Sequence, residues 1–205
     1  MLLFLFFLAC FLPPAVQGVN WLSHYKMMHG FAAVNEAGTV TSWGKADYNF
    51  DAVGVLNDVV SISSTSRAFA ALRSDGTVAA WGDSATGGTA PASDPDAVPD
   101  PATGVTNGLF NVISISATLH AFAALKSDGS VISWGLAGNG GPEALNANAG
   151  QPSDLTDIIA VYGNGNCFLA LKNDGTARVW GRSDYGGRYS GPEGGLSDIA
   201  AVSGT

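Results

Sequence analysis

Residues 67–81 read RAFAALRSDGTVAAW and are followed directly by Gly82. Two short apolar runs, 69–72 and 77–81, flank the tetrapeptide RSDG at 73–76. An Asp-Gly pair between two such runs predicts a β-hairpin, because glycine adopts the positive φ that the turn needs and the aspartate bonds the turn backbone. The stretch therefore predicts two antiparallel strands joined by a tight turn.

The same fifteen-residue module occurs four times without a gap. The other copies are HGFAAVNEAGTVTSW (29–43), HAFAALKSDGSVISW (120–134) and NCFLALKNDGTARVW (166–180). Every module keeps its turn glycine and ends in a Trp-Gly pair, whereas the segments between modules vary in length. The turn glycines are Gly38, Gly76, Gly129 and Gly175, and the pairs are Trp43-Gly44, Trp81-Gly82, Trp134-Gly135 and Trp180-Gly181.

A second repeated strip precedes three of the modules. It reads DVVSISST at 58–65, NVISISAT at 111–118 and DIIAVYGN at 157–164, and a fourth copy, DIAAVSGT, occupies 198–205. The alternation of apolar and polar residues predicts a strand with one drier face. We expect residues 198–205 to form such a strand as well, with its partner hairpin outside this chain.

The hairpin strands are apolar on both faces, so each small sheet needs neighbours on both sides. The many alanines allow adjacent sheets to approach closely. Small antiparallel sheets repeated radially, each packed between two others, form a β-propeller. The predicted fold class is therefore all-β, a β-propeller with about four blades in this chain.

The signature A-[FL]-A-L-[KR]-[SN]-D-G-[ST]-V-x-x-W-G resembles the repeat of the regulator of chromosome condensation family. The resemblance extends over about residues 21–205, in periods of about 21–65, 66–118, 119–164 and 165–205, and it implies a typically seven-bladed propeller. Four modules are fewer than seven, which leaves three interpretations open: a fragment or truncated chain, a partial propeller completed by another chain, or a shorter ring. The family's histidine ahead of the hairpin matches His29 and His120, and Arg67 and Asn166 stand there in the other copies.

Residues 1–18 have the pattern of a secretory signal peptide. The apolar run LLFLFFLACFL at 2–12 is shorter than the roughly twenty residues that a membrane-spanning helix needs, and small residues follow it. Cleavage after Gly18 would remove Cys10, leave Cys167 as the only thiol and place the rest of the chain outside the cell or in the endomembrane lumen. An uncleaved anchor and a misassigned start are the alternatives.

Composition limits the function classes. The 205 residues include 17 acidic and 9 basic side chains, for a net charge of −8. This is the wrong sign for a nucleic-acid surface. The chain has two cysteines and three histidines and lacks the common catalytic and phosphate-binding motifs. We therefore expect no catalysis, no cofactor, no metal site and no stable membrane span.

Two sets of polar residues recur in register. His29, Arg67, His120 and Asn166 lie where the variable loops also leave, and such a loop surface is typical of binding. The alternative is that these four side chains only satisfy the turn backbone. The turn acids Asp75, Asp128 and Asp174, with Ala37 in the first copy, lie at the opposite end. They form either a carboxylate ring for a cation or simple turn chemistry, and we favour the turn.

A third acidic group lies in the long insertion at 82–108. It contains Asp83, Asp94, Asp96 and Asp100 among four prolines. We expect a flexible acidic loop, with Ca²⁺ binding as the alternative.

Three functions follow for comparison. The first is a secreted or surface propeller that binds a protein or glycan partner through its loops without chemistry. The second, implied by the resemblance, is guanine-nucleotide exchange on a small GTPase, and the third is a propeller enzyme such as a lyase or glycosidase. We favour the first, and we expect self-association if open propeller edges stay uncovered.

Overall fold

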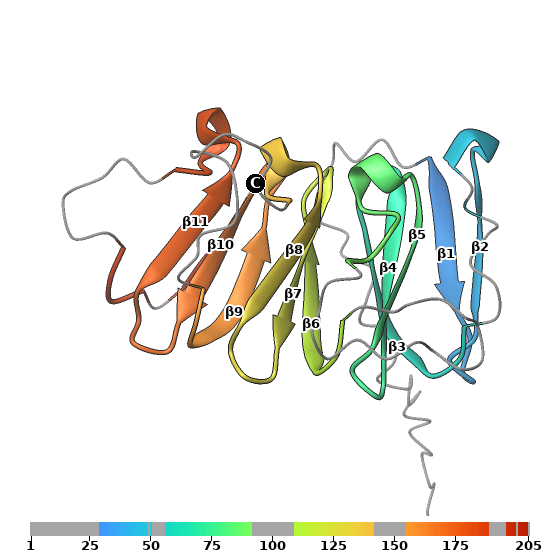
Figure 1. Ribbon diagram of the computed structural model, residues 1–205, viewed down its shortest axis with the longest axis horizontal. Coiled ribbons are helices and arrows are strands. Elements are labelled where there is room, and N and C mark those ends of the chain that lie inside the picture. Colours follow the sequence, from blue (N-terminus) through green and yellow to red (C-terminus); the bar gives the residue numbers. More distant parts are fainter. Residues whose placement is uncertain are drawn as a thin grey trace, which may run out of the picture.

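The computed structural model describes residues 29–48, 50, 56–91, 109–141, 155–188, 196–199 and 201–204. Four antiparallel sheets stand side by side in chain order (Figure 1). We call them blades 1 to 4. Blade 1 has β1 (Gly30–Val34) and β2 (Val40–Gly44); blade 2 has β3 (Val59–Ser64), β4 (Ala68–Arg73) and β5 (Val78–Gly82); blade 3 has β6 (Val112–Ala117), β7 (Ala121–Lys126) and β8 (Val131–Gly135); blade 4 has β9 (Ile158–Gly163), β10 (Cys167–Lys172) and β11 (Ala177–Gly181).

A short 3₁₀ helix follows the last strand of every blade. These helices are η2 (Ala46–Tyr48), η4 (Ser84–Thr86), η5 (Ala137–Asn139) and η6 (Ser183–Tyr185). All four lie at one end of the row of blades, which we call the loop end, and the hairpin turns lie at the other, the turn end (Figure 1). Within the described residues no helix is long and apolar enough to cross a membrane. The predicted signal peptide, residues 1–18, lies outside the described residues.

Each repeated module forms the predicted hairpin. In blade 2, Phe69 pairs with Trp81 and Leu72 with Val78 across the two strands. The four turn glycines have φ between 74° and 81°, in the left-handed region that glycine favours. The prediction of hairpins with glycine at the positive-φ position is confirmed in all four blades.

The repeated strip forms the first strand of the sheet that follows it. β3, β6 and β9 each pair with the first strand of the next hairpin. They are also the strands that bring neighbouring blades together, since the Ser63 hydroxyl donates to Ile115 O (2.8 Å) and the Ser116 hydroxyl to Val161 O (2.7 Å). Each sheet thus consists of a strip and the hairpin that follows it, whereas each period predicted from the sequence began with a hairpin and ended with the next strip.

The fourth strip keeps the start of this geometry and loses the rest. Asp198 has a φ of 54°, like the 57–58° of its three counterparts, and the Ile199 N–H donates to Gly175 O at 3.2 Å. Residues 201–204, however, belong to no strand, and Leu196 forms only an isolated bridge to Ala177. Without a described hairpin beside them, residues 201–204 form no paired strand. The predicted strand at 198–205 has its partners outside this chain, so it stays a prediction.

The apolar core consists of three clusters between consecutive blades. Between blades 2 and 3, Phe122, Ala124 and Trp134 of blade 3 pack on the small side chains of blade 2. The same arrangement joins blades 3 and 4 and, with loop residues added, blades 1 and 2. Each blade therefore has a leading face that carries a Phe-Trp pair, turned to the blade before it, and a trailing face of alanine and aliphatic residues, turned to the blade after it.

Candidate functional site at the loop end

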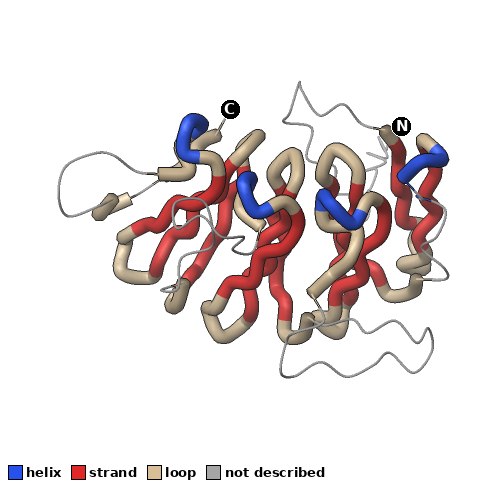
Figure 2. Tube along the Cα trace, turned by 45° about the horizontal axis from the view of Figure 1, so that its top comes forward, coloured by secondary structure: helices blue, strands red, loops and turns tan. Residues whose placement is uncertain are grey.

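The four candidate residues sit at equivalent backbone positions. Each directly precedes the first strand of its hairpin, and its carbonyl accepts from the N–H of the residue that follows the Trp-Gly pair. The four bonds are Lys45 N to His29 O (2.7 Å), Asp83 N to Arg67 O (2.9 Å), Leu136 N to His120 O (2.8 Å) and Arg182 N to Asn166 O (3.0 Å). This closes the open side of each hairpin and sets each candidate beside the start of the segment that holds the 3₁₀ helix. The 3₁₀ helices lie at the same end of successive blades (Figure 2).

The turn that leads into each hairpin is held by a different residue, the last polar side chain of the strip. Thr65 Oγ1 accepts from the N–H groups of Arg67 (3.4 Å) and Ala68 (3.0 Å). Thr118 does the same for residues 120 and 121, and Asn164 Oδ1 for residues 166 and 167. In blades 2 to 4, then, these strip residues bond the turn backbone, and the candidate side chains remain available for other contacts.

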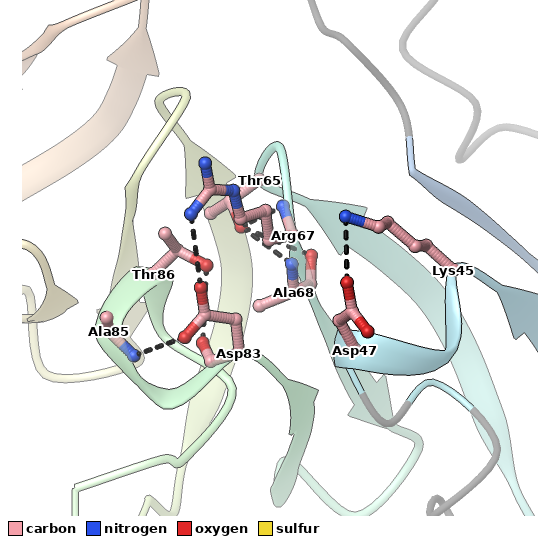
Figure 3. Close-up of polar contacts among 8 residues, drawn as sticks. All are labelled: Lys45, Asp47, Thr65, Arg67, Ala68, Asp83, Ala85 and Thr86. Atoms are coloured by element: carbon pink, nitrogen blue, oxygen red, sulfur yellow. Dashed lines mark hydrogen bonds and ion pairs between the residues drawn. The ribbon is translucent and has the colours of Figure 1, made fainter.

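Arg67 extends over the loop end from blade 2 (Figure 3). One guanidinium nitrogen lies 3.6 Å from Asp83 Oδ2, and the group lies over the Tyr48 ring at 5.2 Å from its centroid. The side chain is 44% exposed. An ion pair of this exposure and length contributes little to stability, so Arg67 remains a cation that a partner can approach.

Tyr48 gathers the polar groups of blades 1 and 2. Its ring centroid lies 5.0 Å from that of His29 and 5.2 Å from the Lys45 ammonium, in addition to Arg67. Lys45 is also paired with Asp47 at 2.8 Å, and that contact raises the pKa of the lysine. The ring thus forms a platform with three nitrogen-bearing side chains around it.

His120 occupies the middle of the row and is half-buried. Its Nδ1 is buried and has no hydrogen-bond partner in the part of the chain that the structure describes. Burial lowers the pKa of His120, and the positive charges of Arg67 and Arg182 lower it further. The His120 imidazole is therefore harder to protonate than a free one, because of its burial and of the positive charges of arginines from the neighbouring blades.

The remaining member, Asn166, has a structural contact. Its Oδ1 accepts from Asn139 Nδ2 at 2.8 Å, which joins the hairpin start of blade 4 to helix η5 after blade 3. Of the four predicted residues, Asn166 is thus used between blades, whereas His29, Arg67 and His120 face ring or charge partners at the surface.

Two further cationic and aromatic residues complete the loop end. Arg182 follows blade 4, is exposed and lies over the Tyr185 ring at 4.8 Å from its centroid. No carboxylate of the described residues lies within ion-pair distance of its guanidinium. The sequence analysis missed Arg182, Tyr48 and Tyr185. The repeated Asp-Tyr pairs at 47–48 and 184–185, three and four residues after the Trp-Gly glycine, were the signal that marks them.

At the opposite end, the recurring acids are turn residues. Oδ1 of Asp128 accepts from both the N–H (2.9 Å) and the hydroxyl (2.6 Å) of Ser130. Asp75 and Asp174 make the same two bonds to Thr77 and Thr176. Such double acceptance is what a turn aspartate does. Among the described residues no three His, Cys, Asp or Glu side chains are grouped so as to hold a metal ion.

Of the long acidic insertion at 82–108, the structure describes residues 82–91. Asp83 caps helix η4, accepting from the Ala85 N–H at 3.0 Å. Asp94, Asp96 and Asp100 lie outside the described residues, so the flexible-loop prediction stays a prediction.

The fold has solved counterparts. Prp20p from Saccharomyces cerevisiae, in a structure that concerns its binding properties to Gsp1p and histones, is similar with a TM-score of 0.52 and 18% identity, over 83% of this chain and 47% of Prp20p. Yeast RCC1 (Prp20) bound to Kap60 is similar with a TM-score of 0.50 and 18% identity, over 83% of this chain and 46% of that one. No family model and no curated protein matches the chain.

These likenesses confirm the fold expected from the repeat signature. The chain has the propeller-repeat fold of the regulator of chromosome condensation, arranged as consecutive blades. It spans about half the length of these solved proteins. At 18% identity the likeness establishes the fold alone.

Proposed function

We propose that this chain is a propeller scaffold that binds a protein partner through the loop end, without catalysing a reaction. The observation that carries the proposal is the row formed by Arg67, His120 and Arg182 on three successive blades. Two exposed arginines act electrostatically on a half-buried imidazole whose Nδ1 lacks a partner among the described residues. The strip residues already bond the turn backbone, so these side chains are free to contact a ligand.

The chemistry of this row favours a partner that carries carboxylates. Arg182 offers a planar guanidinium that binds carboxylate oxygens in a fork geometry. Tyr48 and Tyr185 add aromatic surface beside the cations, and aromatic and arginine side chains carry much of the binding energy at protein interfaces. The net charge of −8 makes local clusters of cations on this chain distinctive.

The test begins with crosslinking mass spectrometry on the full chain to identify the bound protein. Binding is then titrated for wild type, for Arg182→Glu at the loop end and for Lys172→Glu at the turn end. We expect Arg182→Glu to weaken binding by more than about tenfold, as loss of a charged contact does, and Lys172→Glu to leave it near wild type. Equal weakening by both variants would reject the loop end as the binding surface, and a glycan as the sole ligand would reject a protein partner.

Nucleotide exchange on a small GTPase is the second candidate, favoured by the likeness to Prp20p, whose structure concerns binding to Gsp1p and histones. It is separated from the first by a direct assay. Release of a fluorescent GDP analogue from the GTPase is followed with and without the chain. A release rate above the spontaneous rate would replace the non-catalytic proposal with an exchange factor.

A further inference from the structure

The first blade exposes a surface that every other blade buries. The leading faces of blades 2, 3 and 4 hold their Phe-Trp pairs under the preceding blade, with exposed fractions of 0–6%. In blade 1 the equivalent Phe31 is 53% exposed and Trp43 49% exposed, although the two rings stack at 5.6 Å like the buried pairs. The Trp43 indole N–H has no acceptor among the described residues.

The last blade exposes the complementary surface. The buried tryptophans 134 and 180 donate their indole N–H to the carbonyls of Gly87 and Gly140, in the loops of the blades before them. The corresponding residue after blade 4 is Gly186, which has the same left-handed φ but is exposed and accepts no such bond from any described residue. Tyr185 beside it is 53% exposed, whereas its counterparts Thr86 and Asn139 are 4% and 6% exposed.

A third feature without a described partner is the strip at 198–204, beside blade 4. Asp198 and Ile199 dock on the Gly175 turn as the inner strands dock on earlier turns, yet residues 201–204 pair with no described strand. In blades 2 to 4 a hairpin lies beside this strip. Conversely, β1 pairs within the described residues only with β2.

We propose that two copies of this chain pair head to tail. Blade 1 of each copy packs its Phe31–Trp43 pair on blade 4 of the other, in the position of the next blade. One placement fills all three vacancies: Trp43 reaches the Gly186 carbonyl, Tyr185 is covered, and β1 lies beside residues 201–204. This packing repeats the three interfaces between blades inside the chain. Since the leading face of a blade packs there on the trailing face of the blade before it, a second copy of the chain is the partner we propose.

Two such contacts close the assembly. A head-to-tail interface gives a ring when the rotation between copies closes and a filament when it does not. In the proposed pair the two contacts are related by a twofold axis, and each copy contributes one head (the leading face of blade 1) and one tail (the trailing face of blade 4).

Three variants of the full chain test the pairing by sedimentation at micromolar concentration. Trp43→Asp places a charge on the head, the leading face of blade 1. Tyr185→Asp places a charge on the tail, the exposed surface of blade 4. Ile113→Asp is the control. Ile113 is 58% exposed in blade 3, so the control introduces the same charge at a comparably exposed apolar site away from both ends. We expect wild type and Ile113→Asp to sediment as dimers, and both end variants to dimerise roughly thirtyfold or more weakly, as loss of a central aromatic anchor does.

Mixing the two end variants gives the decisive result. The mixture retains one intact interface, from the head of Tyr185→Asp to the tail of Trp43→Asp, so we expect a 1:1 complex that neither variant forms alone. If Tyr185→Asp still dimerises alone, the contact is head to head and the proposal is overturned. A monomeric wild type, with Trp43 shielded from an aqueous quencher by residues 1–28, or larger open polymers, would overturn it as well.

Discussion

The indole N–H of Trp134 donates a hydrogen bond of 3.0 Å to the carbonyl oxygen of Gly87, in the loop of the preceding blade. Trp180 makes the equivalent bond to Gly140 at 3.1 Å, and Trp81 donates to the Ser42 hydroxyl. In blades 2 to 4 the tryptophan of the Trp-Gly pair is therefore a residue that joins one blade to the blade before it. Only the first few residues of each loop have to hold a fixed position, which explains why the loops vary in length while the module does not.

Replacing Trp134 by phenylalanine tests this link. The variant removes the indole donor and leaves the buried Gly87 carbonyl unsatisfied, so the free energy of unfolding should fall by about 1–3 kcal/mol, with a further loss from the smaller ring. Denaturant unfolding of the full chain measures it.

The control is the same substitution at Trp43, which is half-exposed and makes no such bond. At dilutions where the chain is monomeric, Trp43→Phe should change stability by no more than about 0.5 kcal/mol. Similar losses for both variants would show that the hydrogen bond between blades is not what stabilises Trp134.

The second prediction concerns the glycine of the hairpin turn. Gly129 has a φ of 80°, and a Cβ there would lie 3.2 Å from the Asp157 backbone of the next blade. Gly129→Val should therefore cost roughly 1–2 kcal/mol or more through forced positive φ and the clash. Gly138→Val is the control, because a Cβ at Gly138 meets nothing within 4 Å. An unchanged melting temperature for Gly129→Val would mean that the turn is of another type.

The features that the sequence predicted correctly are those determined by local chemistry. Asp128 and Gly129 form a turn because of their own side-chain and backbone preferences, and the apolar runs beside them can only be buried between other sheets. The strand pattern of the strips can likewise be recognised from six consecutive residues. A period repeated four times made each of these local inferences stronger than a single copy would have.

The features that the sequence did not predict depend on contacts between blades. Nothing near His120 in the sequence indicates that Arg67 and Arg182 act on it, because these residues lie 53 and 62 positions away and meet only through the propeller arrangement. Residues 201–204 show the same dependence on neighbouring elements. Their strip pattern matches the others, but a strand forms only where a hairpin lies beside it.

The turn acids predict how stability depends on pH. Hydrogen bonds from the hydroxyl and the N–H of residue i+2 lower the pKa of Asp128 and Asp174 below the ordinary 3.8. A lowered folded-state pKa gives stability that is present above the unfolded value and is lost as pH falls through the folded one. The variant Asp128→Asn/Asp174→Asn keeps the acceptor oxygens without the charge. The variant should therefore be less stable than wild type at pH 6, and its stability should fall less steeply as the pH is lowered.

Melting temperatures between pH 6 and pH 2.5 measure this effect. Ser130→Ala/Thr176→Ala is the matched variant, because it removes the hydroxyl donors and keeps both carboxylates. Its melting temperature should also fall less steeply with decreasing pH than that of wild type, but the difference should be smaller than for the double Asn variant. A double Asn variant whose acid limb is as steep as that of wild type would place the acid sensitivity elsewhere.

Export is the fourth prediction. Residues 1–18 should direct the chain out of the cytosol and be removed, giving a mature N-terminus at Val19. Expression with a reporter and N-terminal sequencing check both statements. A product that stays in the cytosol with Met1 intact would remove the basis for an extracellular partner and would favour the exchange-factor alternative.

The state of His120 gives the last prediction. Burial, and then the charges of Arg67 and Arg182, lower its pKa from the ordinary 6.5. An NMR titration of its ring protons should therefore show a midpoint below 6.5, and Arg182→Ala should move the midpoint up by removing one positive charge. Because the folded chain binds this proton less readily than the unfolded chain, His120 makes the fold less stable as pH falls below 6.5. Lys172→Ala at the turn end is the control and should leave the midpoint unchanged. A midpoint at or above 6.5, or one that Arg182→Ala does not move, would mean that the imidazole is not flanked by these cations, and the row of loop-end residues would have to be rebuilt without it.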